Sequence, residues 1–205
     1  VGTRPEPTRQ ELRVTAEDIE LAISEMTGIP IGTLRLEETA QLLELEDRLC
    51  ERVIGQDHAI KQVAEAIRVA RAGLADERRP IGVFLLVGPT GTGKTELAKA
   101  VAATVFHDED ALVRVDMSEC HDSTFINRLI GSPAGYVGSE RGGVLTEAVR
   151  KRPHTVVLLD EIEKADPAVH VLLLGLMDEG ILTDGLGRTV NFRNTIIILT
   201  SNVGS

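Results

Sequence analysis

Apolar side chains recur at helical spacing in three segments of the first third of the chain. Residues 15–26 repeat apolar positions every three or four residues, and Gly28 and Pro30 end the pattern. Residues 37–50 and 57–72 carry similar apolar stripes. The sequence therefore predicts three amphipathic helices ahead of the remaining chain.

Beyond residue 80, short apolar runs alternate with helical patterns. Residues 81–87 form a continuous apolar run, which is typical of a central parallel strand covered on both faces. Further strand-like runs are 111–115, 155–159 and 195–200, and the helical patterns are 94–105, 119–130, 143–151 and 167–178. Residues 183–193 are typical of a turn segment. This alternation predicts an α/β fold with a parallel sheet of about four core strands flanked by helices.

Composition and charge narrow the class of protein. Of the 205 residues, 42% are hydrophobic and 26% are charged, which is typical of a globular protein. Cys50 and Cys120 lack the spacing of a zinc site or a disulfide framework. No apolar run reaches the roughly 18 residues of a membrane span, so we expect a cytoplasmic protein. The net charge of −10 argues against a broad surface for double-stranded nucleic acid.

Aromatic residues are scarce. The chain has no Trp, four Phe and a single Tyr, so aliphatic side chains must fill most of the core. That Tyr136 lies in the segment Gly135-Tyr136-Val137-Gly138. An isolated Tyr in a Gly-rich loop either packs at a rim or is exposed for a function.

A phosphate-binding sequence lies between a predicted strand and a predicted helix. Residues 88–95 have the pattern G-x-x-x-x-G-K-T in this context. Gly91 and Gly93 let backbone N–H groups close around phosphates, Lys94 neutralises phosphate oxygens, and Thr95 is a ligand for Mg²⁺. We expect the nucleotide at Gly88, Pro89, Thr90, Gly91, Thr92, Gly93, Lys94, Thr95 and Glu96. The motif alone leaves kinases, GTPases and ATPases open.

Two acids and an amide follow later strand-like runs. Asp160 and Glu161 stand at the carboxyl end of the run 155–159, where ligands bind in open α/β sheets. Paired acids also occur in solvated turns, but the upstream phosphate loop favours Mg²⁺ binding by Asp160 and activation of water by Glu161. This pair favours a hydrolase over a kinase. Asn202, at the same edge, either closes a turn or bonds the γ-phosphate or the attacking water.

Together these features resemble the AAA+ ATPases, and more closely the second ATPase domain of the two-tier Clp unfoldases (the ClpB, ClpC, ClpA and ClpV group). The segments that carry the resemblance are Val53-Ile-Gly-Gln, Arg79-Pro-Ile-Gly, Gly88-Pro-Thr-Gly, Asp116-Met-Ser-Glu, Arg128-Leu-Ile-Gly, Gly135-Tyr-Val-Gly, Gly142-Gly-Val-Leu-Thr-Glu-Ala-Val-Arg, Leu182-Thr-Asp-Gly and Phe192-Arg-Asn. Residues 120–127 and Ala134 depart from the usual pattern, which leaves the subfamily open.

The resemblance implies a P-loop NTPase of the AAA+ type, with the large subdomain over 51–205 and a linker and helical connector over 1–50. It implies ATP and Mg²⁺ as cofactors and adenine contacts from Val53 and Ile54, which are otherwise two core aliphatics. The implied catalytic residues are Lys94, Glu161 and Asn202, and the implied metal ligands are Thr95 and Asp160.

The resemblance also implies a chaperone that forms a hexameric ring and threads unfolded or aggregated polypeptide through a central pore. Gly135, Tyr136, Val137 and Gly138 match the loop that grips the substrate. A compartmental protease or other chaperones are open as further partners, and neither nucleic acid nor membrane is expected. A nucleic-acid-remodelling motor and a nucleotide-gated scaffold are the alternatives. The family's arginine finger, fifth core strand, lid and second sensor arginine would follow residue 205, so the isolated chain is expected to be nearly inactive as an ATPase.

Overall fold

The computed structural model describes residue 19 and residues 39–119, 125–133, 135 and 142–203. The first predicted helix, over 15–26, lies outside these residues except for Ile19. Contacts divide the chain into two units, Val1–Leu42 and Leu43–Ser205. Everything described below belongs to the second unit, and the expected domain boundary at residue 51 stays a prediction.

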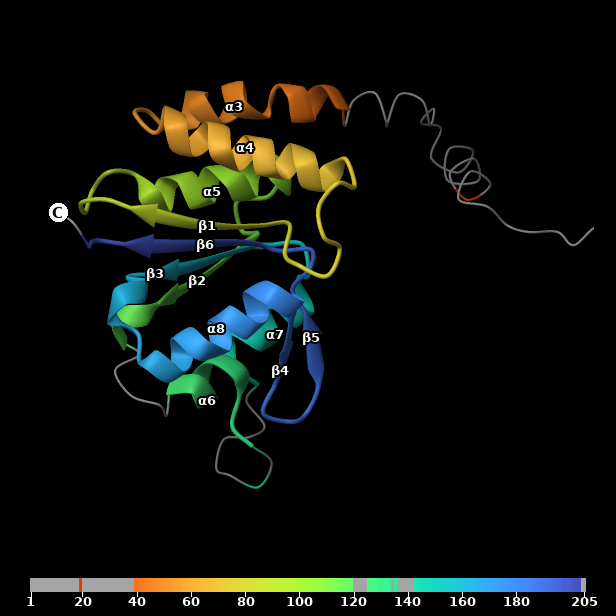
Figure 1. The fold of residues 1–205 in the computed structure, drawn as a ribbon, viewed down its shortest axis with the longest axis vertical. Coiled ribbons are helices and arrows are strands. Elements are labelled where there is room, and N and C mark those ends of the chain that lie inside the picture. Colours follow the sequence, from red (N-terminus) through yellow and green to blue (C-terminus); the bar gives the residue numbers. More distant parts are fainter. Residues whose placement is uncertain (1–18, 20–38, 120–124, 134, 136–141, 204–205) are drawn as a thin grey trace, which may run out of the picture. The chain divides into compact units, whose positions relative to one another are not determined.

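A four-stranded parallel sheet forms the centre of this unit (Figure 1). Its strands are β1 (Gly82–Val87), β2 (Leu112–Asp116), β3 (Val156–Asp160) and β6 (Ile196–Ser201), in the order β1-β6-β3-β2. The predicted parallel α/β sheet is confirmed, and each strand begins within one residue of its prediction. All six residues of β6 are buried, because β6 has a neighbour on each side.

Helices cover both faces of the sheet (Figure 1). The helices α3 (Leu45–Arg52), α4 (Asp57–Arg71) and α5 (Lys94–Val105) lie on one side, and α6 (Phe125–Ile130), α7 (Val144–Lys151) and α8 (Pro167–Glu179) lie on the other. The helix α8 begins where the Asp166 carboxylate accepts a hydrogen bond from the Ala168 N–H (2.8 Å), and it ends at Gly180 in the left-handed conformation.

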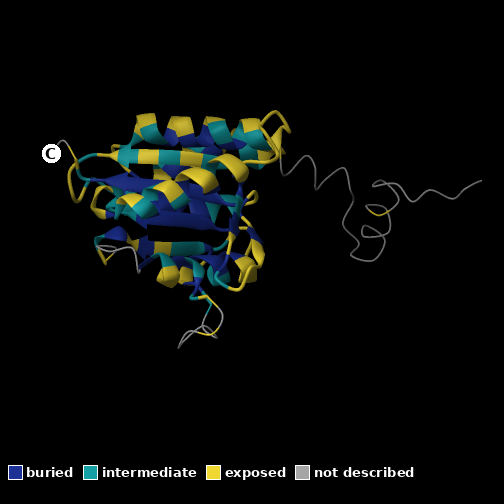
Figure 2. Cartoon of the chain, turned by 60° about the horizontal axis from the view of Figure 1, so that its bottom comes forward, coloured by how far each residue is buried: buried dark blue, intermediate teal, exposed yellow. Residues whose placement is uncertain are grey.

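The core is mainly aliphatic, as the scarcity of aromatic residues predicts. Between the sheet and α6, α7 and α8 it consists largely of Leu, Val and Ile side chains, with Phe125 and the fully buried Phe192 as its aromatic members. Figure 2 shows the central strands β3 and β6 largely in dark blue and the outer faces of the helices largely in yellow. The helical stripes of the sequence therefore mark the faces that pack inward.

The position of β1 corrects one prediction. Among the described residues β1 pairs only with β6, so it is an edge strand and not a central one. Val83, Leu85 and Val87 are exposed on one of its faces. On that face, α6, α7 and α8 cover β6, but the buried core that they form with the sheet includes no residue of β1. A continuous apolar run shows that a strand is hydrophobic on both faces, but it does not show that both faces are covered.

A second, two-stranded sheet lies beside the main one. The strands β4 (Ile181–Thr183) and β5 (Thr189–Asn191) form an antiparallel hairpin between α8 and β6. The sequence predicted only a turn segment here, because each strand has three residues and gives no clear alternation.

Candidate functional site

The phosphate loop connects β1 to α5 at the carboxyl edge of the sheet. Gly91 and Gly93 have φ angles of 85° and 87°, which only glycine adopts without strain. The Thr92 hydroxyl donates a hydrogen bond to the Pro89 carbonyl (3.0 Å), and the Gln56 side chain donates one to the Thr92 carbonyl (2.9 Å). The loop is therefore shaped by its own hydrogen bonds at the N-terminus of α5, where a helix attracts anions.

Lys94 connects this loop to the other strands. Its ammonium group donates hydrogen bonds to the carbonyls of Gly88 (2.6 Å) and Pro89 (2.8 Å) and to Oδ1 of Asn202 (3.0 Å). The Asn202 amide in turn donates to Oε1 of Glu161 (2.9 Å). The three residues predicted as catalytic thus form one hydrogen-bonded chain, drawn from α5 and from the ends of β6 and β3.

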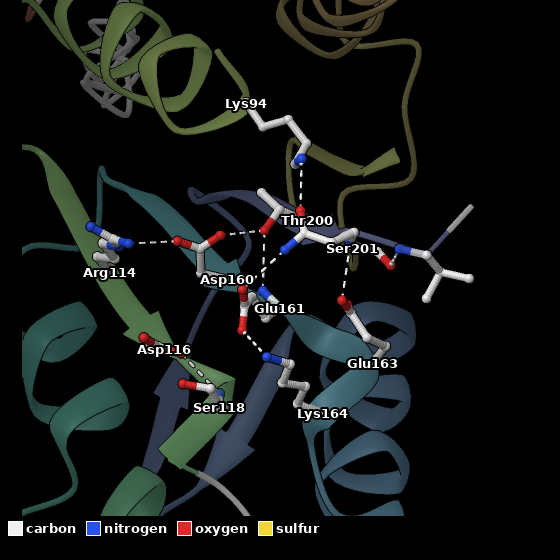
Figure 3. Close-up of polar contacts among 12 residues, drawn as sticks. Lys94, Arg114, Asp116, Ser118, Asp160, Glu161, Glu163, Lys164, Thr200 and Ser201 are labelled. Atoms are coloured by element: carbon white, nitrogen blue, oxygen red, sulfur yellow. Dashed lines mark hydrogen bonds and ion pairs between the residues drawn. The ribbon is translucent and has the colours of Figure 1, made fainter. Parts of the chain in front are cut away.

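Asp160 is held on both of its carboxylate oxygens (Figure 3). The Thr200 hydroxyl donates to Oδ1, and Arg114 donates to Oδ2 from a guanidinium nitrogen 2.6 Å away. Thr200 Oγ1 also accepts the backbone N–H of Glu161 (3.1 Å). One buried hydroxyl therefore positions both members of the acid pair.

Glu161 has a left-handed backbone, with φ 56° and ψ 51°. This conformation is unfavourable for a non-glycine residue, and surrounding contacts must maintain it. Its carboxylate accepts from Asn202 and forms an ion pair with Lys164 (2.8 Å) (Figure 3). The hydrogen bond to Glu161 raises the pKa of the Lys164 ammonium group. The Glu161 carboxylate is therefore held in a defined orientation and is linked through Asn202 to Lys94 of the phosphate loop.

Arg114, Lys164 and Thr200 were missed by the sequence reasoning. Thr200 had a usable signal, because β6 pairs with β3 in register from Ile196 onward and its even-numbered residues share the face of Asp160. Arg114 and Lys164 reach the acids through long side chains, and no local sequence pattern indicates such contacts.

The predicted adenine contacts differ in their surroundings. Val53 is buried, and its Cγ1 would lie 4.0 Å from a β-carbon built on Gly93, whereas Ile54 is 93% exposed. A cavity of about 660 Å³ lies nearby, lined by residues of α4, β1 and the phosphate loop. Its size suits a nucleotide-sized ligand. The roles of Val53 and Ile54 stay predictions.

The predicted substrate loop is described at one residue only. Gly135 is exposed and has a φ angle of 95°. Tyr136, Val137 and Gly138 lie outside the described residues. Their predicted role is therefore not tested by the geometry.

The site fits a metal ion that takes few ligands from the protein. Within the described parts of the chain, no group of three or more His, Cys, Asp or Glu side chains is arranged to hold a metal. The predicted ligands, Asp160 and Thr95, would provide one carboxylate and one hydroxyl, a set that Mg²⁺ would complete with water and phosphate oxygens. Across these same residues, no helix has the length and apolar character needed to cross a bilayer.

Comparisons with known proteins agree with the geometry. The family model described as AAA domain (Cdc48 subfamily) matches residues 79–205. The chaperone protein ClpB of Aquifex aeolicus is 60% identical over 196 residues, which cover 96% of this chain and 20% of the relative. The ClpB of Meiothermus ruber is 61% identical over 192 residues (94% and 22%). The protein named negative regulator of genetic competence ClpC/MecB, from Bacillus subtilis, is 54% identical over 197 residues (96% and 24%). The chain thus spans a quarter or less of the length of these relatives.

Proposed function

The chain belongs to the AAA domain family (Cdc48 subfamily), and from this premise we propose that it is the ATP-binding and ATP-hydrolysing module of a Clp-type protein unfoldase. The observation that carries the proposal is the hydrogen-bonded chain from Lys94 through Asn202 to Glu161. It brings a cation, an amide and a carboxylate base to the N-terminus of α5. That combination is what hydrolysis of a nucleoside triphosphate requires.

ATP would supply the phosphate bond that is cleaved. Mg²⁺ would supply a divalent charge that neutralises the phosphate oxygens. Lys94 would contact the phosphate oxygens, since its ammonium group already lies among the carbonyls of the phosphate loop. Thr95 and Asp160 would hold the metal ion. Arg114 stays beside Asp160 as a counter-ion, and it would compete with the metal for Oδ2.

Glu161 would accept a proton from the attacking water. Its backbone N–H donates to Thr200, which fixes the start of the side chain, and Lys164 forms an ion pair with the carboxylate. Asn202 already bonds Glu161, and we infer that it orients the water or the γ-phosphate through the same amide group. A positioned general base contributes about 10²- to 10⁴-fold to a rate.

The wider activity follows from the relatives. ClpB is named a chaperone protein, and we propose that the protein carrying this chain forms a hexameric ring in the cytoplasm and threads unfolded or aggregated polypeptide through its pore. Gly135, Tyr136, Val137 and Gly138 would contact that substrate. The excess of acidic residues, with a net charge of −10, disfavours a nucleic-acid substrate.

The test uses the full-length protein and two variants. We expect Glu161→Gln to bind ATP with wild-type affinity and to hydrolyse it about 10²- to 10⁴-fold more slowly, and Lys94→Met to lose ATP binding. Wild-type hydrolysis should rise when an unfolded protein is added and should not respond to DNA. Full activity in Glu161→Gln would overturn the catalytic assignment. Stimulation by DNA alone would instead identify a nucleic-acid motor.

A further inference from the structure

The segment that joins α6 to α7 begins and ends in a tightly packed neck, here defined as residues 130–132 and 142–143. Gly131 and Gly142 form an isolated antiparallel bridge. A β-carbon on Gly143 would lie 2.2 Å from the Leu129 carbonyl oxygen, so the two ends of the segment meet backbone against backbone. Gly135 belongs to the segment that this neck closes.

The turn of the β4–β5 hairpin, residues 184–188, packs against the neck (Figure 1). The Gly185 N–H donates to the Ile130 carbonyl (2.9 Å). A β-carbon on Gly185 would lie 2.2 Å from the Gly131 carbonyl oxygen and 2.7 Å from that of Ser132. Only a glycine therefore allows the turn to approach the neck this closely.

A network of charged side chains fixes the turn. The buried Asp184 carboxylate accepts from the backbone N–H groups of Leu186 (3.0 Å) and Arg188 (2.8 Å) and from Nε of Arg188 (2.7 Å). Arg188 also donates to Oε1 of Glu147 on α7 (2.7 Å), and Arg150 holds the other oxygen (2.7 Å).

Glu147 brings this network directly to the neck. A β-carbon on Gly142 would lie 2.0 Å from Cγ of Glu147, so the Glu147 side chain covers the second end of the segment. The turn therefore contacts the first end through Gly185, and the second end through Arg188 and Glu147.

In the chain order, the hairpin lies between the two catalytic strand ends, and it adjoins the amino-terminal end of β6 (Figure 1). Along the chain, Glu161 leads into α8 and β4, and β5 leads into β6 and Asn202. The base of the hairpin is rigid, because Phe192 is fully buried and its N–H donates to the Gly180 carbonyl (2.8 Å). The hairpin is therefore joined to the acid pair through α8 and to Asn202 through β6, and a displacement at the nucleotide site would have to reach it along these two elements.

We propose that the β4–β5 hairpin, held by Asp184, Arg188 and Glu147, couples the nucleotide site to the neck of the segment that carries Gly135. Arg188 is a positioning residue in this scheme, because it acts through Asp184 and Glu147. The inference rests on the proposed function and names the contact through which hydrolysis would move the substrate loop. Coupling through packed elements of this kind is a free energy shared by two sites.

The experiment compares Arg188→Met and Glu147→Met in the full-length protein. Glu147→Met leaves the buried Asp184 paired with Arg188, so a loss of coupling in this variant is not caused by a loss of folding stability at Asp184. Arg79→Met is the matched control, because it removes an exposed ion pair, to Asp178 on α8 (2.9 Å), that has no contact with the neck. The measurements are basal ATPase rate, KM for ATP, ATPase rate with an unfolded protein, and rate of substrate unfolding.

We expect both neck variants to keep the basal rate and KM within about two-fold and to lose about ten-fold in substrate unfolding and in substrate-stimulated ATPase. The Arg79→Met control should match wild type. Two results would overturn the inference. In the first, an unfolded protein stimulates the ATPase of Arg188→Met and of Glu147→Met as much as that of wild type. In the second, the basal and the stimulated ATPase rates of both variants fall by the same factor. A wild-type protein that no polypeptide stimulates would instead overturn the proposed function.

Discussion

Replacing Thr200 by Val removes the one hydroxyl group that holds both acids of the site. The Thr200 side chain is 1% exposed, its hydroxyl donates to Asp160, and it accepts the Glu161 N–H at 3.1 Å. Val has nearly the same shape, so the change leaves no cavity. Its effect therefore isolates the two hydrogen bonds.

The expected loss of stability follows from those contacts. A backbone N–H left without a partner costs about 1–3 kcal/mol. Asp160 keeps its bond to Arg114 (2.6 Å), so losing the hydrogen bond from Thr200 to Asp160 lowers the free energy of unfolding by less. We expect the free energy of unfolding to fall by about 2 kcal/mol, which for a chain of this size lowers the melting temperature by roughly 4–8 °C.

The effect on the rate should be larger than the effect on binding. Glu161 has a left-handed backbone that costs about 1–3 kcal/mol and needs its anchor. Without the hydroxyl the carboxylate is free to shift, and a misplacement of about 1 Å costs on the order of 100-fold in rate. We expect kcat to fall about 10- to 100-fold, while the affinity for ATP is kept because Lys94 and its partners are untouched.

Thr195→Val, directly before the same strand, is the matched control. The Thr195 hydroxyl is fully buried and donates to the Phe192 carbonyl (2.7 Å), but it lies at the amino-terminal end of β6. It should lower stability by about 1 kcal/mol and leave kcat unchanged. Urea unfolding of the chain measures stability, and binding of a fluorescent ATP analogue and steady-state ATPase, both with the full-length protein, measure affinity and kcat. Equal kcat values for Thr200→Val and wild type would refute the role of the hydroxyl.

Three further changes have defined outcomes. Thr155→Val should raise stability by about 1 kcal/mol in urea unfolding, because the Thr155 hydroxyl is buried without a hydrogen-bond partner; a loss of stability would contradict this. Arg114→Gln should lower the Mg²⁺ concentration needed for half-maximal nucleotide binding by a few fold, because it frees Oδ2 of Asp160; an unchanged Mg²⁺ titration would argue against competition. Burial opposes ionisation of Asp184, but hydrogen bonds from Arg188 outweigh it and lower the pKa of the carboxyl. Asp184 thus stabilises the fold above its unfolded pKa of about 3.9. That stability is lost as the pH falls through the lower folded value, so Asp184→Asn should flatten acid unfolding below about pH 4, and an unaltered profile would exclude this contribution.

The arrangement of the site was largely predictable from the sequence. The phosphate loop has a complete motif, and Asp160, Glu161 and Asn202 follow strand-like runs whose carboxyl ends share one edge of a parallel sheet. The hydrogen bonds that join Lys94 to Asn202 and Asn202 to Glu161 agree with that reasoning. The catalytic roles themselves stay predictions.

The charged partners of the acids, Arg114 and Lys164, were not predictable, because these contacts depend on strand order and side-chain reach. Arg114 stands opposite Leu158 in the sheet and extends along the strand to Asp160. Lys164 reaches back to Glu161 across a short 3-10 turn, Ile162–Lys164. Neither contact has a signal in hydrophobic pattern or motif spacing.

The sequence prediction missed the edge position of β1 and the β4–β5 hairpin for the same physical reason. Local pattern reports how apolar a strand is, whereas pairing and cover are properties of the whole fold. β1 is as apolar as a central strand, yet its Val83 face is exposed. In the hairpin, Asp184 and Arg188 look like ordinary turn residues, and only the contact with Glu147 gives them a larger role.

The two halves of the nucleotide site meet on β6. The Ser201 carbonyl accepts the N–H of Gly88 at the start of the phosphate loop (3.2 Å), and the adjacent Thr200 holds Asp160 and the Glu161 backbone. A shift of β6 along its axis would therefore act on the phosphate loop and on the acid pair together. The hairpin directly precedes β6, so a load on the neck would act on this same strand. Coupling between the neck and the nucleotide site thus requires that β6 moves as one piece. The complete burial of β6 in a closely packed interior favours such a movement.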